Sequence, residues 1–214
     1  MKSPQVRKER AKKIFSILQK EIPDARCALE HRNPLELLVA TVLSAQCTDK
    51  RVNEVTKHLF QKYKTAQEYA RTNPNTFEKE IHSTGFYKNK TKSIIACTKK
   101  LVETRKGQVP RTMEELVRLP GIGRKTANVI LGTAFGIPGI VVDTHVKRIS
   151  QRLGLTAHTD PDKIERDLME LIPKKEWTQF SHTIIWHGRQ TCVALKPKCP
   201  ECKVNSLCPS SSMK

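Results

Sequence analysis

The sequence predicts an all-α protein. Apolar residues recur at helical spacing along most of the chain, as in residues 6–21, where Ile14, Phe15 and Leu18 share one face of a basic segment. The only β-branched run, Ile140-Val141-Val142, is short enough to be a buried loop. Capping residues precede the apolar segments, so about ten helices with short connections are expected.

Most helices can be placed from their caps. Asn33-Pro34 begins a helix through Leu43 that is apolar nearly all round, so we expect it in the core. The next cap residues are Thr48 or Asp49, then Thr65 with Glu68, then Asn75 with Glu78, whose helix Gly85 closes. The later helices are expected over residues 90–105, 144–153, 161–172 and 177–189.

The stretch from Leu119 to Ala127, LPGIGRKTA, lies between two further helices. Thr112 with Glu115 predicts a capping box for the first, over residues 113–118, and the second runs from Arg124 to Phe135. A helix that starts after glycines exposes N–H groups able to hold a phosphate, and Lys125 would lie beside it. The alternative is a plain helix–helix turn with a solvated lysine.

Charge favours a polyanionic partner. Lys and Arg number 39 against 21 acidic residues, a formal net charge of +18. Nucleic acid is favoured over an anionic membrane surface, although lysines on helices often form only a solvated face. The longest apolar run, residues 37–43, is too short for a membrane span, and the amino terminus lacks a signal-peptide core. We therefore expect an intracellular, cytoplasmic protein.

Four of the seven cysteines crowd the carboxyl end. Cys192, Cys199, Cys202 and Cys208 follow the spacing C-x6-C-x2-C-x5-C in a segment interrupted by prolines. Four thiolates can form a tetrahedral site for zinc or an iron–sulfur cluster, and the spacing leaves both open. The scattered Cys27, Cys47 and Cys97 are interpreted as small buried hydrophobes.

Four blocks together resemble endonuclease III, the helix–hairpin–helix family of base-excision DNA glycosylases. They are residues 43–49 (LSAQCTD), the hairpin LPGIGRKTA, residues 141–148 (VVDTHVKR) and the terminal cysteine pattern. The resemblance covers about residues 5–208. It implies a six-helix domain over residues 26–136 and a second domain formed by 1–25 with 137–214, with DNA across the cleft between them.

The resemblance also implies site residues and partners. It makes the four terminal cysteines the ligands of a [4Fe-4S] cluster. It places Gln46 and Phe86 in the gap left by a flipped-out base, although the family often has leucine at the second position. A core aromatic beside Gly85 is the alternative for Phe86. Further DNA contacts are expected at Ser44, Gly121, Ile122, Gly123, Arg124 and His145. The partner is double-stranded DNA with damaged bases or abasic sites, bound by a nucleoid-associated monomer.

The implied chemistry centres on Lys125 and Asp143. A helix amino terminus, neighbouring cations and partial burial are expected to disfavour the ammonium form of Lys125, so that its amine can attack the sugar C1′ and form a Schiff base. Strand cleavage by β-elimination then follows. Asp143 would stabilise the cationic sugar, and it could equally cap the helix that begins at Thr144.

The implied activity is that of a DNA glycosylase and abasic-site lyase for oxidised pyrimidines. One alternative is a relative that removes mismatched adenine or thymine, which Lys125 and the short tail after Cys208 disfavour. The other is a non-catalytic DNA-binding or redox-sensing protein that uses the hairpin and the cluster without chemistry.

Overall fold

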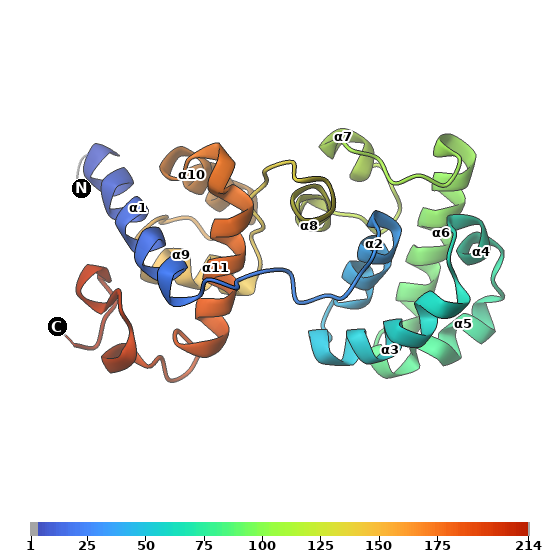
Figure 1. Ribbon diagram of the computed structural model, residues 1–214, viewed down its shortest axis with the longest axis horizontal. Helices are drawn as coiled ribbons and strands as arrows, with labels where there is room; N and C mark the ends of the chain where they lie inside the picture. Colours follow the sequence, from blue (N-terminus) through green and yellow to red (C-terminus); the bar gives the residue numbers. More distant parts are fainter. Residues whose placement is uncertain (1–3, 214) are drawn as a thin grey trace. The chain divides into compact units, whose positions relative to one another are not determined.

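The computed structural model describes residues 4–213 as helices and loops, with no β-strand in that range (Figure 1). By their contacts these residues form two compact units: a continuous unit, Cys27–Ile137, and a discontinuous unit made of residues 4–26 and 138–213. Each unit has its own hydrophobic core. The predicted all-α class is confirmed. None of the helices within residues 4–213 is long and apolar enough to cross a membrane.

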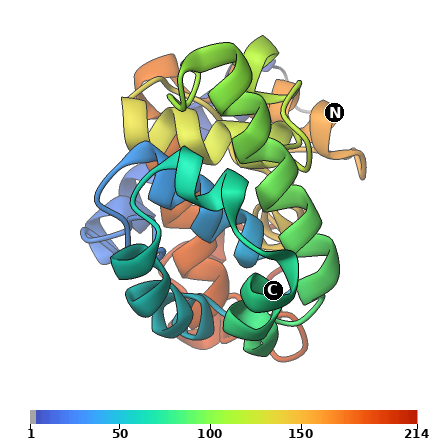
Figure 2. The ribbon, with the colours of Figure 1, turned by 90° about the vertical axis from the view of Figure 1, so that its right-hand side faces the viewer.

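The continuous unit is built around one buried helix. Its helices are α2 (Pro34–Leu43), α3 (Asp49–Lys62), α4 (Ala66–Arg71), α5 (Pro74–Ile81), α6 (Tyr87–Arg105), α7 (Met113–Leu116) and α8 (Arg124–Phe135), with a 3-10 turn, η1 (His82–Thr84), before α6. Every residue of α2 from Glu36 onward is buried, and α2 packs on α3, α6 and α8. The long α6, green in Figure 2, packs on α4 and α5. The nearly all-apolar helix predicted for the core is therefore at its centre.

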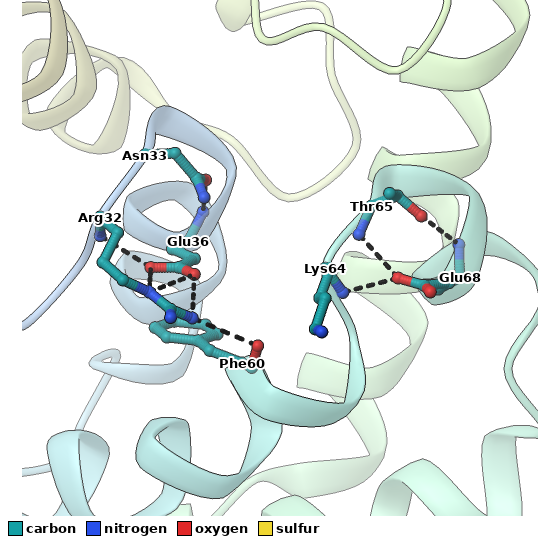
Figure 3. Close-up of polar contacts among 7 residues, drawn as sticks. All are labelled: Arg32, Asn33, Glu36, Phe60, Lys64, Thr65 and Glu68. Carbon is teal, nitrogen blue, oxygen red and sulfur yellow. Dashed lines mark hydrogen bonds and ion pairs between the residues drawn. The ribbon is translucent and has the colours of Figure 1, made fainter.

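Side-chain caps fix where these helices begin. Asn33 accepts a hydrogen bond from the Glu36 amide at 2.9 Å, and the Glu36 carboxylate pairs with Arg32 (Figure 3). Thr65 and Glu68 form a reciprocal capping box at α4, also drawn in Figure 3. Each of these caps satisfies amides that have no partner within the helix. Both caps were predicted from the sequence.

Several helix boundaries in the continuous unit differ from the prediction. Asn73, not Asn75, caps α5, because Pro74 takes the first helical position and the Asn73 side chain accepts the next amides. The sixth helix begins at Tyr87 rather than Lys90. The box at Thr112 is only half formed: Thr112 accepts the Glu115 amide, but the Glu115 carboxylate is ion-paired with Arg105, and α7 ends at Leu116.

The discontinuous unit joins the amino-terminal helix to the carboxyl-terminal ones. Its elements are α1 (Pro4–Glu21), α9 (Thr144–Arg152), α10 (Pro161–Leu171) and α11 (Trp177–Gln190), with 3-10 turns η2 (Lys174–Glu176), η3 (Cys199–Glu201) and η4 (Asn205–Leu207). Helix α1 packs on α10 and α11, and α9 packs on both of those. Gly188 permits the close approach of α11 to α9, since a Cβ there would lie 2.5 Å from Ile149 Cδ1.

Candidate active site

The hairpin between α7 and α8 requires a glycine at position 121. Gly121 has a φ of +77°, and an added Cβ would lie 2.7 Å from the Cβ of Ser93 on α6. Left-handed backbone and this close approach both exclude a larger residue. Ile122 is buried in the core of the unit, and its amide donates to the Leu119 carbonyl at 3.1 Å. Ile122 therefore anchors the turn, and its amide is already engaged.

The start of α8 is open. Gly123 is extended, with φ −94° and ψ 175°, no side chain caps the helix there, and an added Cβ would meet nothing within 4 Å. Arg124 and Lys125 follow in the first turn, and both are exposed. The partial burial expected for Lys125 is not found. Amides and the positive end of the helix dipole here form a surface that suits an anion.

Asp143, the other predicted catalytic residue, directly follows a buried segment that fixes its position. Val141 donates its amide to Ser181 Oγ of α11 at 2.9 Å, and residues 140–142 are buried without forming a strand. The half-buried Asp143 then caps α9, its Oδ1 accepting the Val146 amide at 2.8 Å. The capping role is thus confirmed, and it fixes where the carboxylate lies.

His145 lies in the first turn of α9 and is half-buried. Its Nδ1 is 3.3 Å from the Arg148 guanidinium. Burial lowers the pKa of His145, while the Asp143 carboxylate acts in the opposite direction. The ring therefore favours its neutral form near pH 7 and has a structural partner within its own helix.

Gln46 and Phe86 share an uncommon backbone conformation. Within residues 4–213 only three non-glycine residues have positive φ, and two of them are Gln46 (53°) and Phe86 (48°). Phe86 is 61% exposed, so the alternative of a core aromatic is wrong. Such conformations cost energy and are concentrated at functional sites. Ser44, two residues before Gln46, ends α2, and its hydroxyl donates to the Thr41 carbonyl at 2.9 Å.

The terminal cysteine loop brings its thiols near one another. Burial raises the pKa of Cys202, and the charges of Cys192, Cys199 and Cys208 raise it further. Hydrogen bonds from Ser212 lower the pKa of Cys199. All four are half-buried and lie outside any disulfide, and three of them pack against the core of the discontinuous unit. Across residues 4–213, however, no three Cys, His, Asp or Glu side chains are arranged as a metal-ligand set. The four thiols suit a cluster in type of ligand, and their role as ligands stays a prediction.

Three arginines that sequence reasoning missed hold this loop. Arg152 donates to the Val193 carbonyl at 2.8 Å and approaches Cys192 Sγ at 3.5 Å. Arg148 donates to the Cys192 carbonyl at 2.9 Å, and Arg10 of α1 to the Leu207 carbonyl at 3.1 Å. The i, i+4 spacing of the two arginines on α9 was the available signal, because it places both on one helix face.

The other cysteines divide into two kinds. Cys97 is buried as expected, and burial raises its pKa to about 12. Cys27 and Cys47 are only half-buried, which corrects the prediction for those two.

The predicted site residues fall in two sets, one in each compact unit. The continuous unit carries Ser44, Gln46, Phe86 and residues 121–125, and the discontinuous unit carries Asp143, His145 and the four terminal cysteines.

Comparison with known proteins gives consistent matches. Residues 39–174 match the HhH-GPD superfamily of base excision DNA repair proteins. Endonuclease III of Synechocystis sp. is 56% identical over 206 residues, covering 96% of this chain and 94% of that protein. Endonuclease III of Bacillus subtilis is 49% identical over 187 residues, covering 87% and 85%.

Two solved structures have the same fold. A non-covalent endonuclease III–DNA complex superposes with a TM-score of 0.93 at 45% identity, covering 100% of this chain and 98% of that one. A trapped endonuclease III–DNA covalent intermediate, an estranged-adenine complex, gives the same score and identity and covers 100% and 99%. The chain belongs to the endonuclease III family of base excision DNA repair proteins, within the HhH-GPD superfamily.

Proposed function

We propose that this protein is a bifunctional DNA glycosylase and abasic-site lyase that acts as a monomer on oxidised pyrimidines in duplex DNA. The observation that carries the proposal is the uncapped start of α8, where an exposed lysine follows a hairpin whose tight turn requires glycine. The trapped covalent DNA intermediate of a protein 45% identical to this chain supports a covalent mechanism.

Lys125 is the nucleophile in this proposal. Its neutral amine attacks C1′ of the damaged nucleotide, a C–N bond forms, and the glycosidic bond breaks, so that the base leaves with the bonding electron pair and takes up a proton. Ring opening gives a Schiff base between Lys125 and C1′. Loss of a C2′ proton then expels the 3′ phosphate, which cuts the strand on the 3′ side by β-elimination.

Asp143 supplies negative charge in the same reaction. Its carboxylate stabilises the cationic sugar that develops as the base leaves, and it can accept a proton from the Lys125 ammonium. Capping α9 through Oδ1 orients the group, and the Oδ2 atom is the one proposed to face the sugar. A carboxylate fixed before substrate arrives needs little reorganisation during the reaction.

DNA is held mainly through its backbone. The α8 amino terminus with Gly121, Gly123 and Arg124 binds a phosphate without reading sequence. Extrusion of the damaged base costs a few kcal/mol, and Gln46 and Phe86 fill the vacated space. Ser44 and His145 are proposed to contact DNA near the lesion, although each already has a partner within the protein.

The cysteine loop is proposed to hold a [4Fe-4S] cluster through Cys192, Cys199, Cys202 and Cys208. When bound, the cluster supplies covalent cross-links that order a loop poor in apolar residues. Arg10, Arg148 and Arg152 tie the same loop to α1 and α9. We also propose that the two contact units are the two domains expected from the resemblance.

Duplex oligonucleotides test the proposal. Each carries an oxidised pyrimidine, a mismatched adenine or thymine, or a preformed abasic site. The account expects base release from the oxidised pyrimidine and a 3′ unsaturated aldehyde at the cut. Release of mismatched bases alone would favour the mismatch enzyme. Tight binding with neither release nor cutting would favour the non-catalytic protein.

A further inference from the structure

A buried lysine on α6 joins the two loops that carry Gln46 and Phe86. The Lys90 side chain is 4% exposed. Its Nζ donates to the Leu43 carbonyl at 2.7 Å and to the Thr84 carbonyl at 2.8 Å. Both acceptors are main-chain carbonyl oxygens, so the Lys90 side chain links the backbone at Leu43 to the backbone at Thr84.

The positions of these acceptors link Lys90 to the proposed wedge. Leu43 is the last residue of α2, three before Gln46, and Thr84 is the last residue of η1, two before Phe86. The Lys90 amide also donates to the Phe86 carbonyl at 3.1 Å. One residue therefore fixes the backbone beside both wedge positions.

Both loops need such a constraint. Gln46 and Phe86 have left-handed backbone, which is unfavourable for a residue with a Cβ and persists only where surrounding contacts impose it. The Leu43 carbonyl also lies at the carboxyl end of α2, where main-chain acceptors lack helical partners and cations are favoured.

The setting of Lys90 is unlike that of a surface lysine. Burial lowers its pKa, and Cys47, the residue after Gln46, acts in the opposite direction. Lysine is rarely placed in a protein interior, where removing its hydration is costly unless its donors are satisfied. An apolar residue would fill the same space but would leave two buried carbonyls without donors.

We propose that Lys90 is a positioning residue that holds the Gln46 and Phe86 loops in register, so that both side chains enter the duplex together. This inference rests on the proposed function and names how its wedge is held. Lys90 itself touches neither the sugar nor the base in this account.

The test compares Lys90→Met with Lys99→Met, an exposed lysine on the same helix. A duplex carries an abasic site opposite 2-aminopurine, whose fluorescence reports wedge insertion. For Lys90→Met we expect roughly tenfold weaker strand cleavage in this duplex and a reduced fluorescence change. Cleavage of a single-stranded abasic oligonucleotide, which has no opposite base to separate, should stay within about twofold of wild type.

Two further variants separate positioning from general destabilisation. In a background that carries both Gln46→Ala and Phe86→Ala, Lys90→Met should add little, because both side chains that it positions are already gone. Lys90→Arg keeps cationic donors and should recover part of the duplex activity, and it serves as the comparison if Lys90→Met does not fold.

The outcomes divide clearly. Three results would each overturn the inference: wild-type activity of Lys90→Met on the duplex, equal losses on duplex and single strand, or a full additional loss in the background that lacks both the Gln46 and Phe86 side chains. If wild-type protein forms no borohydride-trapped adduct with abasic DNA, the proposed function itself fails.

Discussion

Single side chains in this protein serve structure and proposed chemistry at once. Asp143 caps α9 through one oxygen, and the same carboxylate is proposed to stabilise a cationic sugar. A capping interaction needs only an acceptor, whereas the chemistry needs a negative charge. The two roles can therefore be separated by substitution.

Asparagine at position 143 keeps an acceptor and loses the charge. For Asp143→Asn we expect the free energy of unfolding to stay within about 0.5 kcal/mol of wild type, because Asn caps nearly as well as Asp. Base release should fall by about 100-fold or more. Asp143→Ala should also lose about 1 kcal/mol of stability. Thermal unfolding with single-turnover kinetics measures both, and an active Asp143→Asn enzyme would rule out the electrostatic role.

The limits of sequence reasoning are clearest at Phe86. Its place next to a helix-ending glycine allowed either a core or an exposed aromatic. In the structure it is exposed on a left-handed backbone, two residues after Thr84, whose carbonyl the Lys90 side chain links to that of Leu43. No local pattern encodes a contact between residues so far apart in the chain. By contrast, the cap at Asn33 and the box at Thr65 act within one turn and were predicted correctly.

At the scale of elements, the two glycines of the hairpin have different physical tasks. Gly121 makes the turn, since its φ is +77° and α6 leaves no room for a Cβ. Gly123 has backbone that any residue adopts and open space around it. The first glycine is required by folding, and the second is proposed to be required by the approach of a phosphate.

Alanine at each position tests this division. We expect Gly121→Ala to lose about 1–3 kcal/mol in the free energy of unfolding, because of strained backbone and the clash with Ser93. Gly123→Ala should change stability by less than about 0.5 kcal/mol. It should nevertheless weaken binding to undamaged duplex, measured by fluorescence anisotropy. Full DNA affinity in a stable Gly123→Ala protein would contradict phosphate binding at this turn.

The cysteine loop is the element that depends most on a bound group. Removal of iron from the cluster-containing protein with a chelator should raise the rate of amide hydrogen exchange across residues 192–208. The core helices α2 and α6 should stay protected from exchange. Hydrogen exchange followed by mass spectrometry measures this difference. Unchanged protection of the loop after complete iron loss would show that the three arginines order it alone.

At the scale of the whole molecule, the excess of basic residues bears on what the protein binds. The net charge of +18 favours any polyanion, and the proposed phosphate contacts carry no sequence information. The sequence predicted the helical class and most of the helices, because caps and apolar periodicity are local. It did not predict the arginine contacts to the cysteine loop, which join α1 and α9 to the distant carboxyl end.

Binding to undamaged duplex should therefore depend steeply on salt. The logarithm of the association constant is expected to fall linearly with the logarithm of salt concentration, with a slope of about −0.9 for each phosphate neutralised. Titrations at several salt concentrations measure the slope, and substitution of Lys99 by Met serves as the control for a lysine outside the proposed site. A flat dependence would indicate that phosphate contacts do not dominate affinity.

The central claim is that the Lys125 amine becomes covalently joined to C1′ of the damaged nucleotide. Borohydride reduction during incubation with abasic-site duplex, followed by mass spectrometry of the cross-linked peptide, tests it most directly. The account predicts a stable protein–DNA adduct mapped to Lys125 and absent in Lys125→Ala. An adduct at another residue, or one of equal yield in Lys125→Ala, would contradict it.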